Sequence, residues 1–190
     1  MLDLDHTLIH SEEYELVSKA IAHKNRRDKN AKKGDIANGG VVSEKTKEKY
    51  ESIIKAMETL EHYNMDNEFI VFLRPHVREF LDHVTRNHRY GVWTAADKHY
   101  ATSILNFLNL THPQYLLFNI HCNYSSRIVP PGNPKNIHHF KTLFAEELKV
   151  ILFDDDERVY KDQQEYVHNI VPFYYSNTDD RVLLDLIQIL

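Results

Sequence analysis

Residues 2–10 of the chain read LDLDHTLIH, and this stretch decides the fold. Apolar residues alternate with Asp3 and Asp5, which predicts a short strand whose carboxylates emerge at its end. An Asp beside a strand end is most often a turn or capping residue when it stands alone. The pair is more specific, because one carboxylate can attack phosphorus while the other moves the proton of the leaving group. Asp3 is therefore the candidate nucleophile, and Asp5 the candidate general acid and base.

A second acidic cluster, Asp154 to Glu157, directly follows the apolar run at 150–153. A buried parallel strand that ends in carboxylates supplies the oxygen ligands that Mg²⁺ prefers. Taken alone, the cluster is better explained as a solvated turn that favours the start of the next helix. In combination with the first acidic pair, the pattern favours a metal site.

Two further polar residues lie between the acidic clusters in the sequence. Thr94 ends the apolar stretch at 90–93, and Lys135 follows a Pro/Gly-rich segment. A hydroxyl and an ammonium suit the oxygens of a transferring phosphoryl group. The simpler alternatives are that Thr94 caps a helix and that Lys135 is a solvated surface lysine.

From residue 69 onward, strand and helix patterns alternate. The predicted strands are 69–73, 90–93, 115–118, 150–153 and 170–172, and the predicted helices are 77–87, 98–108, 137–148 and 179–190. This alternation predicts an α/β fold with a Rossmann-like parallel sheet and helices on both faces. Ligands of such sheets bind outside the carboxyl ends of the strands, where both acidic clusters are expected.

The stretch between the first strand and residue 69 has a different pattern. Apolar residues at helical spacing predict one helix over 12–24 and a second one that Ser43 caps. The segment 25–43 between them is basic, then rich in Gly and Asn, and predicts a loop. We therefore expect a helical hairpin at 12–66, inserted after the first strand of a single domain over residues 1–190.

Composition excludes several classes of protein. The net charge of −5 argues against direct nucleic-acid binding over a broad surface. Cys122 is the only cysteine, so no intramolecular disulfide is possible. No apolar run is long enough for a membrane span, and no signal-peptide pattern begins the chain. We expect an intracellular protein, nuclear or cytoplasmic, without a membrane association. The oligomeric state is not predictable.

Five stretches carry a resemblance to a known family. They are DLDHTLIHS (3–11), FLRPHVREFL (72–81), YGVWTAADKHYA (90–101), NPKNI (133–137) and KVILFDDD (149–156). In this order they resemble the haloacid dehalogenase superfamily, and more narrowly its FCP/SCP branch, the phosphatases of the RNA polymerase II C-terminal domain and their relatives. The resemblance implies a Mg²⁺-dependent phosphomonoester hydrolase with an aspartyl-phosphate intermediate. The implied substrate and partner is a protein phosphorylated on serine or threonine.

The resemblance also assigns catalytic and metal roles. Asp3 matches the nucleophile and a metal ligand, and Asp5 matches the general acid and base, whose backbone carbonyl also binds the metal. Asp155 matches the direct Mg²⁺ ligand of the second cluster, with Asp154 acting through water. Because three Asp residues follow one another, a register shifted to Asp155 and Asp156 stays open. The first register is preferred because relatives place the pair directly after the apolar strand.

Substrate contacts are implied in the same way. Thr94 and Lys135 match the phosphate-binding residues, and Tyr100 sits where relatives have a tyrosine beside the substrate. Lys135 lies further from the second acidic cluster than expected, so Lys141 remains a rival. Relatives of the small C-terminal-domain phosphatase type have a β insertion that selects the peptide, whereas this chain shows a charged helical pattern. Peptide specificity is therefore not transferred.

Three alternatives to a protein phosphatase are kept. A phosphatase of small metabolites or of nucleic-acid ends would use the same residues with a different insertion. A non-catalytic binding module, as in the mitochondrial import subunit that resembles this branch, is disfavoured because every candidate residue is present. A phosphotransferase would need a second acceptor pocket.

Overall fold

The computed structural model describes residues 1–33, 42–110, 115–117, 135–142 and 149–190. The chain divides into two compact units, each with its own sheet and helices. Unit 1 is Met1–Leu8, His76–Phe173 and Arg181–Leu190, and unit 2 is Ile9–Pro75 with Tyr174–Asp180. That residues 1–190 form a single domain stays a prediction.

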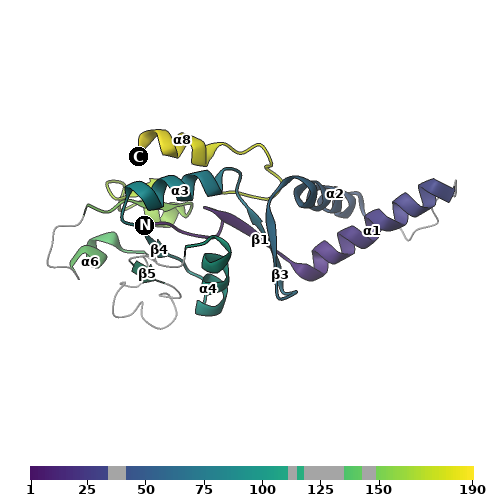
Figure 1. Ribbon diagram of the computed structural model, residues 1–190, viewed down its shortest axis with the longest axis horizontal. Coiled ribbons are helices and arrows are strands. Elements are labelled where there is room, and N and C mark those ends of the chain that lie inside the picture. Colours follow the sequence, from purple (N-terminus) through teal and green to yellow (C-terminus); the bar gives the residue numbers. More distant parts are fainter. Residues whose placement is uncertain (34–41, 111–114, 118–134, 143–148) are drawn as a thin grey trace. The chain divides into compact units, whose positions relative to one another are not determined.

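Unit 1 is the α/β part of the chain (Figure 1). Its strands are β4 (Gly91–Trp93), β5 (Tyr115–Leu117), β6 (Leu152–Asp154) and β7 (Val167–Asn169), and its helices are α3 (Val77–Asn87), α4 (Lys98–Phe107), α6 (Ile137–Thr142), α7 (Glu157–Tyr160) and α8 (Val182–Ile189). Strand β7 begins three residues before the predicted strand at 170–172. The second half of the helix predicted over 137–148 lies outside the described residues.

The strands of unit 1 pair in parallel around the first residues of the chain. Strand β4 pairs with β5, β6 pairs with β7, and both pairs are parallel. Leu2 forms parallel bridges to Val92 on one side and Phe153 on the other. The start of the chain therefore lies between β4 and β6. The predicted α/β class is confirmed, and these pairings are its parallel part; the complete Rossmann-like sheet stays a prediction.

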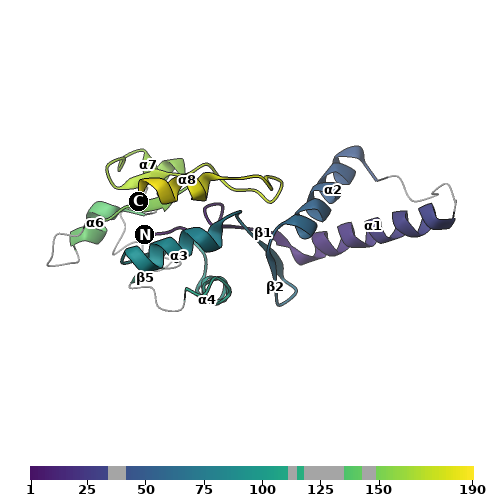
Figure 2. The same ribbon diagram turned by 45° about the horizontal axis from the view of Figure 1, so that its top comes forward.

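Helices pack against both faces of these strands, because side chains of successive strand residues point to opposite faces. On one face, the ring of Phe80 from α3 meets the ring of Phe153 edge-on, with centroids 6.1 Å apart. On the other face, α6 and α7 contribute to a buried cluster formed by Trp93, Ile137, Phe140, Leu152, Val159 and Val167. Helix α8 packs beside α3, as two views of the ribbon show (Figure 2).

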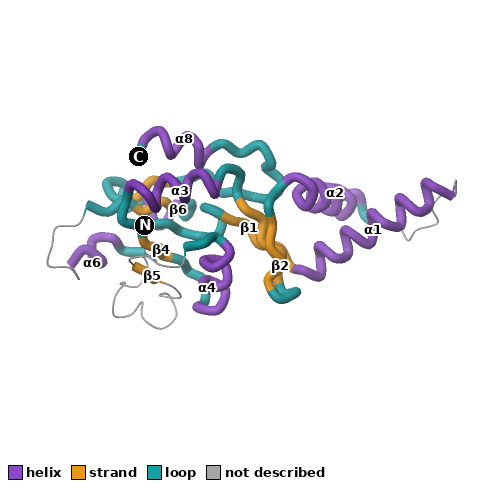
Figure 3. Tube along the Cα trace, viewed as in Figure 1, coloured by secondary structure: helices purple, strands orange, loops and turns teal. Residues whose placement is uncertain are grey.

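Unit 2 contains β1 (Ile9–Glu13), α1 (Tyr14–Lys33), α2 (Glu44–Thr59), β2 (His62–Met65) and β3 (Phe69–Leu73). The three strands form an antiparallel sheet in the order β1-β3-β2. They belong to the orange group of strands beside the labels β1 and β2 in Figure 3. Residues 69–73 were predicted to belong to the parallel sheet, and this prediction is wrong. The strand itself has the predicted bounds, but its partners are two strands that the sequence pattern did not reveal.

A tight turn joins β2 to β3. Asp66 and Asn67 have φ angles of 51° and 60°, and the N–H of Glu68 donates to the carbonyl of Met65 at 2.9 Å. Two central residues with positive φ define a type I′ turn, whose twist matches that of a hairpin. The span 12–66 therefore ends in a β-hairpin in addition to the predicted pair of helices.

Helices α1 and α2 pack on each other and confirm the helical pair. Ser43 caps α2 as predicted, since its hydroxyl accepts from the N–H of Thr46. The predicted loop at 25–43 is wrong for residues 25–33, which continue α1, and 34–41 lie outside the described residues. Within the added stretch, Arg27 pairs with Glu51 of α2 at 2.9 Å, and both side chains of this pair are exposed. None of the described helices is long and apolar enough to cross a membrane.

A buried ion pair fastens the segment Tyr174–Asp180 to the end of β3 within unit 2. Arg74 Nε and Nη2 donate to the two carboxylate oxygens of Asp180, each at 2.9 Å. Both side chains are almost completely inaccessible to solvent. A two-point contact of this kind fixes the orientation of both groups, and loss of either partner leaves a charge buried without its counterion.

We expect Arg74→Met to lower the free energy of unfolding by about 3–5 kcal/mol, because the buried carboxylate of Asp180 would lose its counterion. Urea denaturation followed by circular dichroism measures the change. Arg86→Met is the matched control, because its ion pair with Asp82 is exposed and is expected to contribute less than about 1 kcal/mol. Equal losses for the two variants would contradict the proposed importance of burial.

Candidate active site

The first acidic pair lies where the chain leaves the sheet of unit 1. The N–H of Asp3 donates to the carbonyl of Phe153 at 3.0 Å. The chain then turns, because the N–H of Leu8 returns to the carbonyl of Leu4 at 2.8 Å. Asp3 therefore remains attached to the sheet, whereas Asp5 lies on the turn beyond it.

The second acidic cluster ends β6 and lies against Asp3. Asp3, Asp154 and Asp155 each offer a carboxylate oxygen, and these atoms all lie within 4.8 Å of one another. Three carboxylate oxygens at this spacing fit a hard divalent cation. Asp156 is engaged elsewhere, since its carboxylate caps α7 and pairs with Arg158 at 2.7 Å. This geometry favours Asp154 and Asp155 over the shifted register.

Lys135 is a buried cation between two of these carboxylates. Its ammonium donates to Asp3 Oδ1 and to Asp154 Oδ2, each at 2.5 Å. The alternative of a solvated surface lysine is therefore wrong. Lys141 lies elsewhere, with its ammonium 4.5 Å from the centroid of the Tyr166 ring. Of the two rival lysines, the structure thus brings only Lys135 to the acidic cluster.

Gln163 holds the backbone around Lys135, and sequence reasoning missed it. Its amide nitrogen donates to the carbonyl of Lys135 at 2.7 Å and to that of Val159 at 2.9 Å. Its amide oxygen accepts from the N–H of Ile137 at 2.6 Å. The side chain is buried. No local pattern distinguishes this glutamine, because two of these three partners, Lys135 and Ile137, lie 28 and 26 positions away.

Thr94 directly follows β4, and Tyr100 lies in the first turn of α4. The hydroxyl of buried Thr94 accepts from the N–H of Ala96 at 3.1 Å. The N-cap of α4 is Asp97, so the alternative in which Thr94 caps this helix is wrong. The hydroxyl of Tyr100 donates to Asp5 Oδ1 at 2.6 Å. Tyr100 thus contacts a predicted catalytic residue directly.

Two residues of the first motif support the acidic groups from the same turn. The hydroxyl of Thr7 donates to Asp155 Oδ1 at 3.3 Å. His6 has a φ angle of 57°, and its carbonyl accepts from the N–H of Phe173 at 2.7 Å. Sequence reasoning assigned no role to either residue. The turn is therefore tied both to the second acidic cluster and to the segment after β7.

Burial is the largest single influence on the pKa values of Asp3, Asp5 and Lys135. Burial raises the pKa of Asp3 to about 7; the nearby charge of Lys135 lowers it, and that of Asp154 raises it. Burial also raises the pKa of Asp5, although the hydrogen bond from Tyr100 acts in the opposite direction. Burial lowers the pKa of Lys135, but the charges of Asp3 and Asp154 outweigh this effect and leave the pKa raised. The lysine is therefore cationic.

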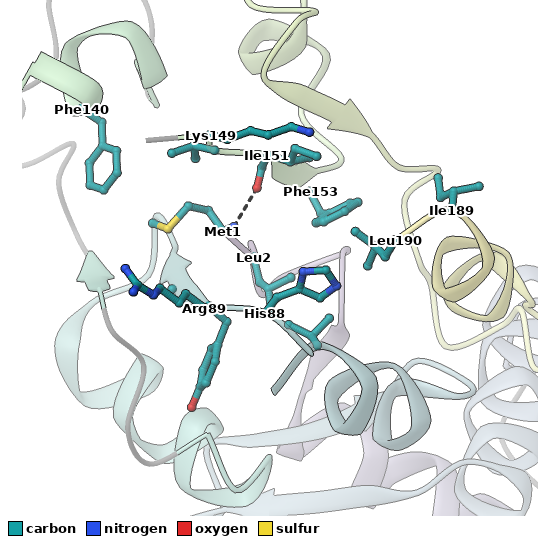
Figure 4. Close-up of a pocket in the computed structure, with 14 residues that line it drawn as sticks. Met1, Leu2, His88, Arg89, Phe140, Lys149, Ile151, Phe153, Ile189 and Leu190 are labelled. Carbon is teal, nitrogen blue, oxygen red and sulfur yellow. Dashed lines mark hydrogen bonds between the residues drawn. The ribbon is translucent and has the colours of Figure 1, made fainter. Parts of the chain in front are cut away.

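A cavity of about 380 Å³ lies at the other ends of the strands, and none of the candidate catalytic residues lines it. Its walls include Arg89 before β4, Ile151 before β6 and Leu190 at the end of α8 (Figure 4). The amino group of Met1 donates to the carbonyl of Ile151 at 2.7 Å, and burial lowers the pKa of this amino group to about 5. The candidate active site is thus the acidic cluster at the carboxyl ends and not this cavity.

Carboxylates and a buried lysine at the carboxyl ends of parallel strands are the arrangement expected of a phosphatase of the α/β class. The chain belongs to the NLI interacting factor-like phosphatase family, whose match covers residues 1–190. It is 29% identical over 150 residues to a CTD phosphatase-like protein of Invertebrate iridescent virus 3, covering 71% of this chain and 78% of the relative. The corresponding protein of Invertebrate iridescent virus 6 is 26% identical over 136 residues, covering 66% and 75%.

Solved structures of Fcp1, an RNA polymerase II CTD phosphatase, have a similar fold. One gives a TM-score of 0.54 at 14% identity, covering 91% of this chain and 41% of Fcp1. The fission yeast protein with beryllium fluoride gives 0.55 at 15% identity, covering 99% and 48%. This chain thus spans less than half of either solved chain. The predicted family and the prediction of a phosphatase are confirmed, and the individual residue roles stay predictions.

We expect the free energy of unfolding of Asp3→Asn, compared with that of the metal-free wild-type protein, to be more favourable at about pH 8 than at about pH 5. The folded-state pKa of about 7 lies above the ordinary 3.8, so between these values the folded state keeps a proton that the unfolded state has lost. The contribution of Asp3 to stability therefore falls as the pH rises, and Asn avoids this loss. Urea denaturation in EDTA at both pH values measures the difference. A stability gain that does not grow with pH would contradict the raised pKa.

Proposed function

We propose that this protein hydrolyses phosphomonoesters with Asp3 as the nucleophile, Asp5 as the general acid and base, and Mg²⁺ as the cofactor. The observation that carries the proposal is the buried contact of Lys135 with Asp3 and Asp154, beside Asp155. A structural salt bridge needs one carboxylate for one lysine. Three carboxylates around one buried cation suit a site that also binds a metal ion and a phosphoryl group.

In the first step, a carboxylate oxygen of Asp3 attacks phosphorus and forms an acyl phosphate. The bond from phosphorus to the ester oxygen breaks, and Asp5 gives its proton to that oxygen, so that an alcohol leaves. The ammonium of Lys135 and the hydroxyl of Thr94 stabilise the phosphoryl oxygens. The raised pKa of Asp5 favours the protonated form that this step requires.

In the second step, Asp5 takes a proton from water, whose oxygen attacks phosphorus. The bond from phosphorus to Asp3 breaks, which restores the carboxylate and releases inorganic phosphate. The two steps together consume one water for each ester. Asp5 changes from acid to base between them, so its carboxyl must keep one position through both.

The carboxylates of Asp3, Asp154 and Asp155 would hold Mg²⁺, together with the carbonyl of Asp5. When bound, the ion neutralises charge on the phosphoryl oxygens and orients them. Asp155 is the direct ligand in this proposal, and Asp154 acts through water. The hydrogen bond from Thr7 orients Asp155 for this role.

A protein phosphorylated on serine or threonine is the proposed substrate and partner. The names of the viral relatives and of Fcp1 refer to phosphatases of the RNA polymerase II C-terminal domain, and this supports a peptide substrate. The resemblance links peptide selection to a β insertion, whereas the insertion of this chain is a helical pair with a β-hairpin. No peptide sequence is therefore assigned. A panel of phosphopeptides, sugar phosphates and 5′-phosphorylated oligonucleotides would separate this substrate from the alternatives.

The first test removes the nucleophile. Asp3→Asn keeps the shape of the side chain but removes the attacking charge, so turnover of p-nitrophenyl phosphate should fall at least about a thousandfold. Asp162→Asn, at an exposed position, is the matched control and should leave turnover unchanged. Retention of a tenth of the wild-type activity by Asp3→Asn would refute the mechanism.

The second test separates the three consecutive aspartates. Asp155→Ala should raise the Mg²⁺ concentration for half-maximal activity most, Asp154→Ala less, and Asp156→Ala least, because Asp156 is bound to Arg158. Activity titrations and calorimetry with Mg²⁺ both measure this order. If Asp156→Ala proves the most damaging, the metal ligands are shifted by one residue.

A further inference from the structure

The hydrogen bond from Tyr100 to Asp5 joins two elements that are far apart in the sequence. The hydroxyl donates to Asp5 Oδ1 at 2.6 Å across 95 positions. This distance lies at the short end of the range for a hydroxyl that donates to an oxygen. The family resemblance places a tyrosine beside the substrate at this position, whereas here its hydroxyl contacts the proposed acid and base.

The backbone of Tyr100 is fixed by the start of α4. The carboxylate of Asp97 accepts from the N–H of Tyr100 at 2.9 Å and so caps the helix. The next residue, Ala101, is completely buried and donates its N–H to the carbonyl of Asp97 at 3.0 Å. The aromatic ring therefore extends from a capped first turn, and the hydrogen bond to Asp5 holds its hydroxyl.

The contact also distinguishes the two oxygens of the Asp5 carboxyl. Oδ1 accepts the hydrogen bond from Tyr100, so a proton on the carboxyl is directed to Oδ2. We propose that Tyr100 is a positioning residue that holds Asp5 through Oδ1 and leaves Oδ2 to exchange the proton with the leaving oxygen and with water. This inference rests on the proposed function, because it assumes that Asp5 is the acid and base.

The role predicts a dependence on the leaving group. An alkyl phosphate such as phosphoserine releases an alkoxide unless a proton arrives as the bond breaks, so it needs a well-placed acid. A p-nitrophenolate ion leaves readily without a proton. Loss of positioning therefore slows the first step for alkyl esters far more than for p-nitrophenyl phosphate. At saturating enzyme concentration, a tyrosine that only bound substrate would change the concentration for half-maximal rate and leave the maximal rate unchanged. A tyrosine that only supported the fold would slow both substrates alike.

The experiment compares single-turnover rates of alcohol release, with enzyme in excess, for a phosphoserine peptide and p-nitrophenyl phosphate. Tyr100→Phe should lower the rate for the peptide about ten- to a hundredfold and the rate for p-nitrophenyl phosphate less than about threefold. The expected loss for the peptide is smaller than the full contribution of a general acid, because Asp5 is still present. Asp5→Asn is the reference and should show the same selectivity with a larger loss. Tyr160→Phe is the matched control, a partly buried tyrosine of unit 1 that should affect neither substrate.

The outcomes separate this inference from the proposed function. If Asp5→Asn shows the selectivity and Tyr100→Phe slows both substrates equally, or raises only KM, the positioning role is refuted while the mechanism stands. If Asp3→Asn and Asp5→Asn leave turnover intact, the proposed function itself fails. Circular dichroism and thermal melting of Tyr100→Phe check that the variant is folded before its rates are compared.

Discussion

Asp3 and Asp154 bring two carboxylates to the same edge of the unit 1 sheet with almost no access to water. Like charges so close together repel strongly in an environment of low polarity, and each has also lost its hydration. The ammonium of Lys135 lies within hydrogen-bonding distance of both. Without the ammonium of Lys135, the carboxylates of Asp3 and Asp154 would be two buried negative charges with no positive charge between them. The rest of the site therefore depends on this lysine.

The position of Lys135 is secured by packing as much as by charge. Gln163 binds the carbonyl of this lysine and the N–H of Ile137 two residues later, and Ile137 belongs to the buried cluster around Trp93. The core of unit 1 therefore holds the lysine in place before any substrate arrives. Groups that are already oriented need no rearrangement as charge develops on a phosphoryl group, which is the physical basis of electrostatic catalysis.

Strong local patterns allowed correct prediction of several elements. Helix α3 and strand β3 have the predicted bounds, and Ser43 begins α2 as expected. The partners of β3 were missed because strand pairing is set by contacts distant in the sequence. A residue pattern records burial but not parallel or antiparallel direction. The Asp66-Asn67 turn was the available local signal, since both residue types tolerate positive φ.

The sequence by itself determined the family, the α/β class and the candidate residues, because alternating Leu and Asp at a strand end and ordered motifs are local features. Only the tertiary structure decided which of these residues meet. It placed Lys135 rather than Lys141 at the acidic cluster, and it joined Tyr100 to Asp5. The physical reason is that the chain distances between these partners exceed any local period, so only the packing of the strands and helices of unit 1 brings them into contact.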